Sequence, residues 1–525
     1  MKYFFKSDVL VSPYIMNWYA WPQLIPPITL AANIVKKYIK IMEKYIEDPI
    51  GEQKKANDPE LLGGPYIDLS PERIVDIISL LSETKKSNLI QLYLSIQQCD
   101  EIMQRCAKGD SMSTLYSKVP DCLKGMVELV YDRNGNPHIR LFEELFYNKW
   151  YEPNLQSLVF AEIKQDFRTY SLRNTPLVDK LDQIKLCIPF AHAALDKLFS
   201  SRYNGLTKNE FNQLCTELNI EPCIIEKYFT KDSFINSDKN YIGDNLRVRY
   251  FGHACILLQS KNISILIDPI ISYDFNSQNK RYTLSDLPDQ IDYVLLTHKH
   301  MDHFSIETLI QIRHKVKHIV VPRNLQGDLI DPSMKLILKK LGFNSILSLD
   351  EFDSINFAEN SIHAIPFIGE HSDLNLTSKL SYIVKINNKK IFFAVDIENV
   401  EPAIYRNIFE NYGKIDLLFI GMECEGAPCS WLYGPLLGTS LKNEHNKRRT
   451  LKGCNAKQAL EMVKIVQCNE AYVYAMGLEP WLSHIMGISY NEDTPQILES
   501  NLFIEECKKQ SIKAERLNFI KEWVL

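Results

Sequence analysis

LLTHKHMDHF, Leu295–Phe304, is the stretch that decides the fold of this chain. An apolar run ends in a threonine, and three histidines and one aspartate follow within six residues. If the apolar run is a β-strand, His298 and His300 emerge on one side of it, because strand side chains alternate with a period of two. The loop then turns, so Asp302 and His303 can face a neighbouring position. This spacing predicts two adjacent metal sites.

Strands and helices alternate around this loop. Residues 246–268 predict one strand, a turn at Lys261–Asn262 and a second strand that ends in Asp268. Further strand-like runs are DYVLLTH, HIVVP, SYIVKINNKKIFFAVD, IDLLFIGME and AYVYAMG, and helical patterns such as SIETLIQIRHKV and NAKQALEMVKIVQ separate them. Because several of these strands end in His, Asp or Glu, we expect an α/β sandwich with its chemistry at the strand ends.

The first half of the chain has a different, mixed pattern. Residues 28–46 and 89–106 have helical periodicity, and Pro71 follows Ser70 at the first position of a further helix. An Asn134–Gly135 turn joins two short strands. Thr207 is placed to cap a later helix. These signals predict a mixed α+β fold.

A polar, glycine-containing stretch near residue 240, SDKNYIGDN, has the composition of a linker. A chain of 525 residues is also too long for one ordinary domain. We therefore expect an N-terminal α+β domain over residues 1–240 and a catalytic domain over residues 246–525.

Composition excludes several classes of protein. The net charge is −5 and the pI is about 6.2, which gives no sign of a nucleic-acid groove or a basic membrane surface. No apolar run approaches the roughly 18 residues of a membrane span, and the N-terminus has no signal-peptide pattern. The 12 cysteines are scattered, without a CxxC pair, which is typical of reduced thiols. We expect a cytoplasmic protein.

From Leu246 onward the chain resembles the metallo-β-lactamase superfamily. FGHACILL, LIDP, THKHMDH and FFAVD follow one another in the order that this family uses. The resemblance implies an αββα sandwich with metals in a cleft at one edge of the sheets. It also implies that Asp396, at the end of FFAVD, bridges two metals.

The chain departs from the family's zinc hydrolases, which usually supply a third histidine between the HxHxDH loop and the bridging aspartate. We interpret His314 and His318 as solvated and His363 as an ordinary strand residue. The segment IHAIPFIGEHSDLN leaves Glu370 or His371 at the end of a strand.

Ligand chemistry favours Glu370. With Glu370 at one metal and His484 at the other, each metal receives two imidazoles and two carboxylates, Asp396 being shared. An oxygen-enriched set of this kind suits iron or manganese better than a histidine-richer set does, although the ligand types alone leave zinc open.

Four further motifs are similar to a particular family, the diiron β-hydroxylases that act on amino acids thioesterified to nonribosomal peptide synthetase carrier domains, as in chloramphenicol biosynthesis. They are PFIGEH, VDIENVEPAIY, GMECEGAPCSWLYGPLL and MGLEPWLSHIMG, all between Pro366 and Gly487. The resemblance implies two irons with Asp396 between them. One iron would bind His298, His300, Glu370 and Asp396, and the other Asp302, His303, Asp396 and His484.

Other polar residues lie near these motifs. Glu370 and Glu423 are our candidates for a catalytic role, Glu423 and Glu425 being placed to orient a ligand imidazole or to cap a loop. Trp431 and Tyr433 fit either a substrate pocket or simple packing. We expect His253 to be a hydrogen-bonded structural histidine. In an extended backbone, His371 would point away from Glu370.

The resemblance implies an oxygenase that uses O2 and electrons from an external donor to hydroxylate the β-carbon of a carrier-bound amino acid. Its expected partners are the carrier domain, a reductase or other electron donor, and a second copy of the chain. The aromatic start, with Trp18 and Trp21, suits an interface or burial. The first rival is a dinuclear zinc hydrolase of a lactone, phosphodiester or thioester. The second is a non-catalytic binding scaffold, which the complete predicted ligand set argues against.

Overall fold

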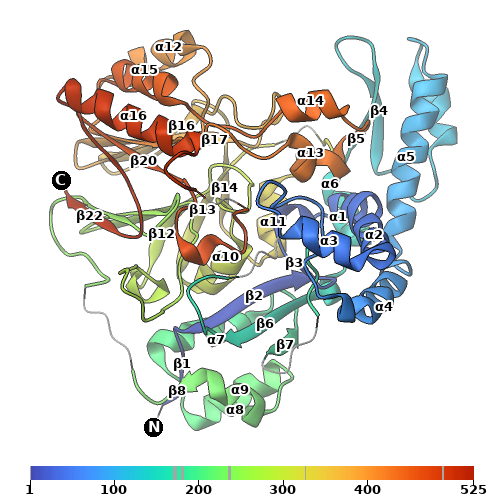
Figure 1. Cartoon of the computed structure of the whole chain (residues 1–525), viewed down its shortest axis with the longest axis horizontal. Coiled ribbons are helices and arrows are strands. Elements are labelled where there is room, and N and C mark those ends of the chain that lie inside the picture. Colours follow the sequence, from blue (N-terminus) through green and yellow to red (C-terminus); the bar gives the residue numbers. More distant parts are fainter. Residues whose placement is uncertain (1, 169–173, 179–182, 234–237, 325–326, 488–489) are drawn as a thin grey trace.

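The structure is a computed structural model, and it describes residues 2–168, 174–178, 183–233, 238–324, 327–487 and 490–525 (Figure 1). Two seven-stranded sheets lie face to face in the second half of the chain. The first has the order β14-β13-β12-β11-β10-β9-β22. Its strands are β9 (Arg247–Tyr250), β10 (Ile256–Ser260), β11 (Ile263–Ile267), β12 (Ile291–Leu295), β13 (Val316–Pro322), β14 (Ile346–Leu349) and β22 (Lys521–Val524).

The second sheet has the order β15-β16-β17-β18-β19-β20-β21. Its strands are β15 (Ser354–Phe357), β16 (Asn360–Pro366), β17 (Leu380–Ile386), β18 (Lys389–Val395), β19 (Leu417–Gly421), β20 (Glu470–Tyr474) and β21 (Lys513–Arg516). Strands β18 to β21 are parallel, so the ends of β18, β19 and β20 meet at one edge. The helices of this half are α10 (Ile306–Ile312), α11 (Met334–Lys340), α12 (Pro402–Tyr412), α13 (Cys429–Tyr433), α14 (Asn443–Arg448), α15 (Ala456–Val466) and α16 (Pro495–Lys509).

Helices cover both outer faces of these sheets, which confirms the predicted αββα sandwich. Helices α12, α15 and α16 lie together at the upper left of Figure 1 and share an apolar core with the second sheet. Helices α10 and α11 pack on the outer face of the first sheet. The capping residues Ser305 and Asn455 begin α10 and α15 by accepting backbone N–H bonds.

The N-terminal half is a mixed α+β unit, as expected. Its strands are β1 (Phe4–Phe5), β2 (Val9–Ile15), β3 (Trp18–Tyr19), β4 (Val127–Tyr131), β5 (Pro137–Leu141), β6 (Gln156–Glu162), β7 (Ile184–Cys187) and β8 (Phe229–Thr230). Its helices are α1 (Pro27–Asn33), which continues through a π-helical segment (Ile34–Tyr38) into α2 (Ile39–Glu47), then α3 (Pro49–Ala56), α4 (Ile74–Thr84), α5 (Leu89–Cys106), α6 (Glu143–Trp150), α7 (Ala193–Asn204), α8 (Lys208–Glu217) and α9 (Pro222–Ile225). The helix over 89–106, the hairpin at Asn134–Gly135 and the Thr207 cap of α8 are confirmed.

One apolar core joins the two halves. Leu258 and Ile265 of the first sheet face the second sheet, whereas Leu257 and Leu266 belong to the core that continues into the N-terminal half. These strands are thus buried on both faces, which is why they read as nearly continuous apolar runs. Trp18 lies in the same core, 1% exposed and stacked on Tyr38.

Two sequence interpretations need correction, and one open alternative is resolved. The run after Leu246 is two strands, because Gly252 and His253 adopt positive φ angles (105° and 49°) and turn the chain between β9 and β10. Of the two alternatives left open for Trp18 and Trp21, the structure shows burial within the chain. The ring nitrogens of His314 are buried without a hydrogen-bond partner among the described residues, so that side chain is not solvated.

Candidate metal centre

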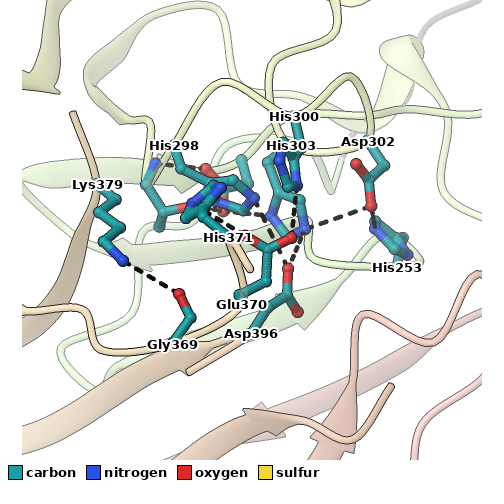
Figure 2. Close-up of polar contacts among 12 residues, drawn as sticks. His253, His298, His300, Asp302, His303, Gly369, Glu370, His371, Lys379 and Asp396 are labelled. Atoms are coloured by element: carbon teal, nitrogen blue, oxygen red, sulfur yellow. Dashed lines mark hydrogen bonds and ion pairs between the residues drawn. The ribbon is translucent and has the colours of Figure 1, made fainter. Parts of the chain in front are cut away.

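Six of the seven predicted ligands converge where several strands end (Figure 2). The loop after β12 carries His298, His300, Asp302 and His303, and Asp396 follows β18 directly. Glu370 and its neighbour His371 follow β16. The site is thus assembled from both sheets, at the edge that the sequence predicted.

The first group contains His298, His300, Glu370 and His371, all buried, with one possible ligand atom of each lying within 4.8 Å of the others. The Glu370 carboxylate lies between two imidazoles, with Oε1 2.7 Å from His300 Nδ1 and Oε2 2.9 Å from His371 Nε2. The first metal position therefore has three imidazoles around one carboxylate.

Backbone geometry explains why Glu370 and His371 face the same site. Gly369 and Glu370 have φ angles of 88° and 64°, so the chain is not extended here and successive side chains do not alternate. A side chain at Gly369 would place its Cβ 2.3 Å from that of Glu398, so this position requires glycine. The expectation that His371 points away from Glu370 was wrong for this reason.

The second group contains Asp302, His303 and Asp396. His303 Nε2 lies 2.8 Å from Asp396 Oδ2 and 3.5 Å from Asp302 Oδ2. Asp396 Oδ2 is also 3.8 Å from His298 Nε2, so it lies between the two groups. Gly421 makes room for this carboxylate, since a Cβ there would lie 2.5 Å from Asp396 Oδ1. The place of Asp396 between the two groups is consistent with the bridging role that the family resemblance implied.

His253 supports the second group without offering it a free nitrogen. Its Nδ1 accepts the backbone N–H of Gly477 at 3.1 Å, so the proton of a neutral ring resides on Nε2. Nε2 then donates to Asp302 Oδ2, 3.1 Å away. His253 is therefore a hydrogen-bonded positioning residue, as expected.

Asp268 orients imidazoles of both groups, a role that sequence reasoning missed. Its Oδ2 lies 2.9 Å from His303 Nδ1 and accepts the Thr297 hydroxyl at 2.6 Å. The Thr297 hydroxyl oxygen in turn lies 3.0 Å from His298 Nδ1. Each ring thus has one nitrogen engaged and Nε2 free to face the site, the usual arrangement of a metal-bound histidine. The signal that the sequence offered for this role was the place of Asp268 at the end of LIDP, after a buried strand.

Tyr433 orients the first group from the opposite side. Its hydroxyl lies 2.9 Å from His300 Nε2 and 2.8 Å from His371 Nδ1. The side chain is fully buried, on α13. Tyr433 therefore holds both imidazoles against Glu370, and nothing in the pattern WLY predicted this role.

The residues present fit a pair of cations. Buried polar atoms are normally hydrogen-bonded. Here His298 Nε2, His303 Nε2, Glu370 Oε2, His371 Nε2 and Asp396 Oδ1 are buried without a hydrogen-bond partner among the described residues. All five atoms belong to the converging groups, and metal ligation would satisfy all five.

The pKa values of the imidazoles differ between the two groups. Burial lowers the pKa of His371 to about 4 and that of His298 well below its usual value. Burial has the same tendency at His303, but Asp396 and Asp302 raise the pKa of that imidazole well above its usual value. Burial opposes ionisation of Glu370, yet His300 and His371 hold the pKa of its carboxyl below the ordinary range.

His484 lies elsewhere, which disagrees with the predicted ligand set. Its Nδ1 is 3.0 Å from the Trp481 carbonyl oxygen and its Nε2 is 3.3 Å from the Tyr19 hydroxyl of the N-terminal half. Tyr19 also donates to Glu307, which pairs with Arg168. Because both ring nitrogens are engaged in this network between the two halves, the geometry gives His484 no place among the converging ligands.

The metal groups open into a cleft of about 830 Å³ that both halves of the chain line. His300, Asp302, Glu370 and Asp396 are exposed to it from the floor. Its walls include Pro59, Glu60, Leu62 and Gly63 from the N-terminal half, together with Glu423, Glu425, Trp431, Ile485 and Tyr490. Glu423 thus faces the cleft, as a catalytic candidate should. Burial and then the nearby carboxylates of Asp302, Asp396 and Glu370 raise its pKa well above the ordinary value.

An αββα sandwich with two adjoining ligand groups and a shared aspartate defines a dinuclear metal protein of the metallo-β-lactamase fold. Residues 264–433 match the β-lactamase superfamily domain, and residues 4–232 match the N-terminal domain of diiron non-heme β-hydroxylases. The chain belongs to the diiron non-heme β-hydroxylase family. Enzymes of this family carry two irons.

Similarity to one member extends over the whole chain. The 4-amino-L-phenylalanyl-[CmlP-peptidyl-carrier-protein] 3-hydroxylase of Streptomyces venezuelae is 32% identical, and the alignment covers 99% of each chain. The crystal structure of CmlA, a diiron β-hydroxylase from Streptomyces venezuelae, superposes with a TM-score of 0.93 over 100% of both chains, at 32% identity. A UPF0173 protein of Pyrococcus abyssi is 38% identical over 33% of this chain and 69% of its own length.

The alternative of a protein without catalysis has no support from these similarities. All 12 cysteines lie in the described part of the chain and all are free thiols. Among the described residues, no helix combines the length and the apolar character that crossing a membrane requires.

Proposed function

We propose that this protein hydroxylates the β-carbon of an amino acid that is held as a thioester on a carrier domain. The Streptomyces relative is named for hydroxylation at carbon 3, the β-carbon, of an aminoacyl carrier protein. The observation that carries the proposal is the set of five buried ligand atoms without a hydrogen-bond partner among the described residues. Two of them belong to Glu370 and Asp396, which line a cleft that the N-terminal half helps to build. A cleft of about 830 Å³ has room for a substrate larger than a free amino acid.

We assign the first iron to His298, His300, Glu370 and Asp396, with His371 either a further ligand or a hydrogen-bond donor to Glu370. We assign the second iron to Asp302, His303 and Asp396. His484, which the sequence predicted as a fourth ligand, is not part of this set. The two groups share Asp396, and its position between His298 and His303 supports a bridge.

The irons, when reduced, would supply O2 activation and the removal of a hydrogen atom from an unactivated carbon. The chain's own residues hold and orient these ligands. Asp268 keeps the His303 proton on Nδ1 and, through Thr297, orients His298, so that Nε2 of each ring can bind metal. Trp431 and Leu432 line the cleft wall beside the metal groups and exclude water from part of it. Glu423, like Glu60 and Glu425, is a carboxyl group that faces the cleft without being in either converging set.

The partners follow from the same proposal. A carrier domain presents the substrate, and a separate reductase or other electron donor reduces the irons. Residues 1–240 narrow the cleft through the segment from Pro59 to Gly63 and are the region that we assign to carrier recognition and to a homodimer contact. We place the reaction in the cytoplasm, where free thiols such as the exposed Cys187 and Cys223 stay reduced.

One observation favours a second candidate, a dinuclear metallohydrolase. His371 adds a third imidazole to the first group, which makes that group richer in histidine than the sequence predicted. Three imidazoles suit zinc as well as iron. A hydrolase would use a metal-bound hydroxide and would need neither O2 nor electrons.

Metal analysis with optical spectroscopy separates the two candidates. Protein produced with adequate iron should contain two irons per chain, and its spectrum should change when anaerobically reduced protein meets air. Two zincs per chain, with no oxygen-dependent change, would contradict the oxygenase proposal. Incubation with a carrier-bound amino acid should then add one oxygen atom to the amino acid, by mass.

A further inference from the structure

A segment rich in basic side chains ends at the wall of the metal cleft. Residues 442–452, which we call the basic strap, contain five basic side chains and one acidic side chain, Glu444, although the chain as a whole has a net charge of −5. The strap includes helix α14 and lies beside α13, as Figure 1 shows. The net charge of the strap is therefore positive, whereas the net charge of the whole chain is negative.

The C-terminal end of the strap is hydrogen-bonded to the segment that begins helix α13. The Cys429 N–H donates to the Arg449 carbonyl oxygen at 2.9 Å, and the Leu451 N–H donates to the Ala427 carbonyl oxygen at 2.9 Å. Ala427, Leu451 and Lys452 line the cleft themselves. The C-terminal end of the strap is therefore part of the cleft wall, and helix α14, with Lys447 and Arg448, directly precedes it.

Two of the five cations have structural partners and three do not. Arg449 donates to the Ser372 carbonyl oxygen, and Lys452 pairs with Glu398 at 3.1 Å. Lys442, Lys447 and Arg448 are exposed, and no acidic side chain of the described residues lies within ion-pairing distance of them. Three free cations at the mouth of a cleft attract an anion there.

The opposite charge lines the cleft itself. The acidic side chains of Glu60 and Glu425 line its walls. A ligand that complements both regions is anionic where it passes the rim and cationic where it enters. An aminoacyl thioester on a phosphopantetheine arm has this order, since its phosphodiester lies next to the carrier and its α-ammonium group at the far end.

We propose that the basic strap, together with the N-terminal segment from Pro59 to Gly63 that lines the same cleft, is the docking surface for the carrier domain. Lys442, Lys447 and Arg448 bind the phosphodiester of its prosthetic arm. This proposal rests on the proposed function, because it assumes a carrier-bound substrate. It goes further by stating which surface the carrier meets and which group of the arm is recognised.

The test compares binding of two forms of one carrier, the peptidyl carrier protein on which the Streptomyces relative acts, with and without the phosphopantetheine arm. The strap variant is Lys442→Glu, Lys447→Glu and Arg448→Glu. The control variant, Lys317→Glu, Lys457→Glu and Lys508→Glu, makes the same change in net charge at three exposed lysines away from the cleft. Both variants should keep two irons and the wild-type optical spectrum, and a strap variant with glutamine replaces the first if it does not fold.

We expect the wild type and the control to bind the arm-bearing carrier about tenfold more tightly than the armless one, with an affinity that falls as salt rises. The strap variant should bind the arm-bearing form at least about tenfold more weakly and lose the preference for the arm. Unchanged binding by the strap variant would overturn the docking proposal alone. A wild type that binds neither form would overturn the carrier-bound substrate as well. Loss of reduction by a protein electron donor, with carrier binding intact, would assign the strap to that donor and overturn the proposal.

Discussion

The two metal positions differ in what supports them. Around the first, the imidazoles of His300 and His371 are held by Tyr433, which lies in the GAPCSWLYGPLL block. Around the second, Asp302 and His303 are held by His253 and Asp268, from the FGHAC and LIDP motifs. The second position is thus supported from the loop after β9 and the end of β11, and the first from helix α13, far along the chain. The supports of the two positions can therefore be changed separately, except at Asp268, which contacts His303 and reaches His298 through Thr297.

The bridging residue should be indispensable to both positions. Asp396→Asn keeps the shape of the side chain but removes the charge that faces His298 and His303. We expect iron content to fall below one per chain and hydroxylation to fall by at least about 1000-fold, since losing several kcal/mol of metal-centred stabilisation has that effect. Iron analysis and single-turnover product formation measure this. Two tightly bound irons in Asp396→Asn would rule out the bridge.

Loss of the Asp268 carboxylate should weaken metal binding at both positions. Asp268→Ala frees His303 Nδ1 and the Thr297 hydroxyl together, so both rings lose their orientation. Loss of such a hydrogen-bond partner typically weakens metal affinity by about 10- to 100-fold. Competition with a chelator should reveal weaker binding of both irons. If only one iron is weakened, the coupling through Thr297 to His298 is incorrect.

Tyr433 should affect the first position alone. Tyr433→Phe removes one hydroxyl that contacts His300 and His371, and the apolar ring can still pack against α1 and its neighbours in the core. We expect a fall of about tenfold in affinity for one iron and little change for the other. Tyr490→Phe, which removes from the cleft wall a hydroxyl that has no hydrogen-bond partner among the described residues, is the matched control. An equal loss of affinity for both irons would show that Tyr433 does not support the first position alone.

The smallest expected difference between the two metal positions is in the pH dependence of their metal uptake. His298 and His371 have lowered pKa values, about 4 for His371, so in the metal-free protein they are already neutral near pH 6. His303 has a raised pKa and must release a proton to bind metal. Affinity at the second position should therefore rise with pH by up to about tenfold per unit below that pKa, while the first changes less. Stepwise metal titration of metal-free protein at pH 6 and pH 8 should show first-position filling at the lower pH. The same pH slope for both positions would contradict this assignment.

Local patterns predicted most of the fold and the centre of the site. The period-two strand before His298 and the capping signal at Thr207 act over a few residues, so the sequence displays them directly. The role of His371 depended on a left-handed backbone at Glu370, which no spacing rule predicts for a non-glycine residue. His484 was misjudged because its partner, Tyr19, lies 465 residues away. Tyr433 was missed for the same reason, since its contacts to His300 and His371 span 133 and 62 residues.

The apolar core shared by the two halves bears on how the chain is made. Leu257 and Leu266 are covered by a core that continues through the N-terminal half to Trp18. Synthesis delivers the N-terminal half first, and that half emerges with this face uncovered until β10 and β11 leave the ribosome. The edge strand of the first sheet, β22, pairs with β9 but follows all the other strands in the chain, so the sheet is complete only after the rest of the second half has been synthesised. Loading of iron should accordingly be one of the final steps of biogenesis, and a stalled or truncated chain should be a target for chaperones before it is a metal protein.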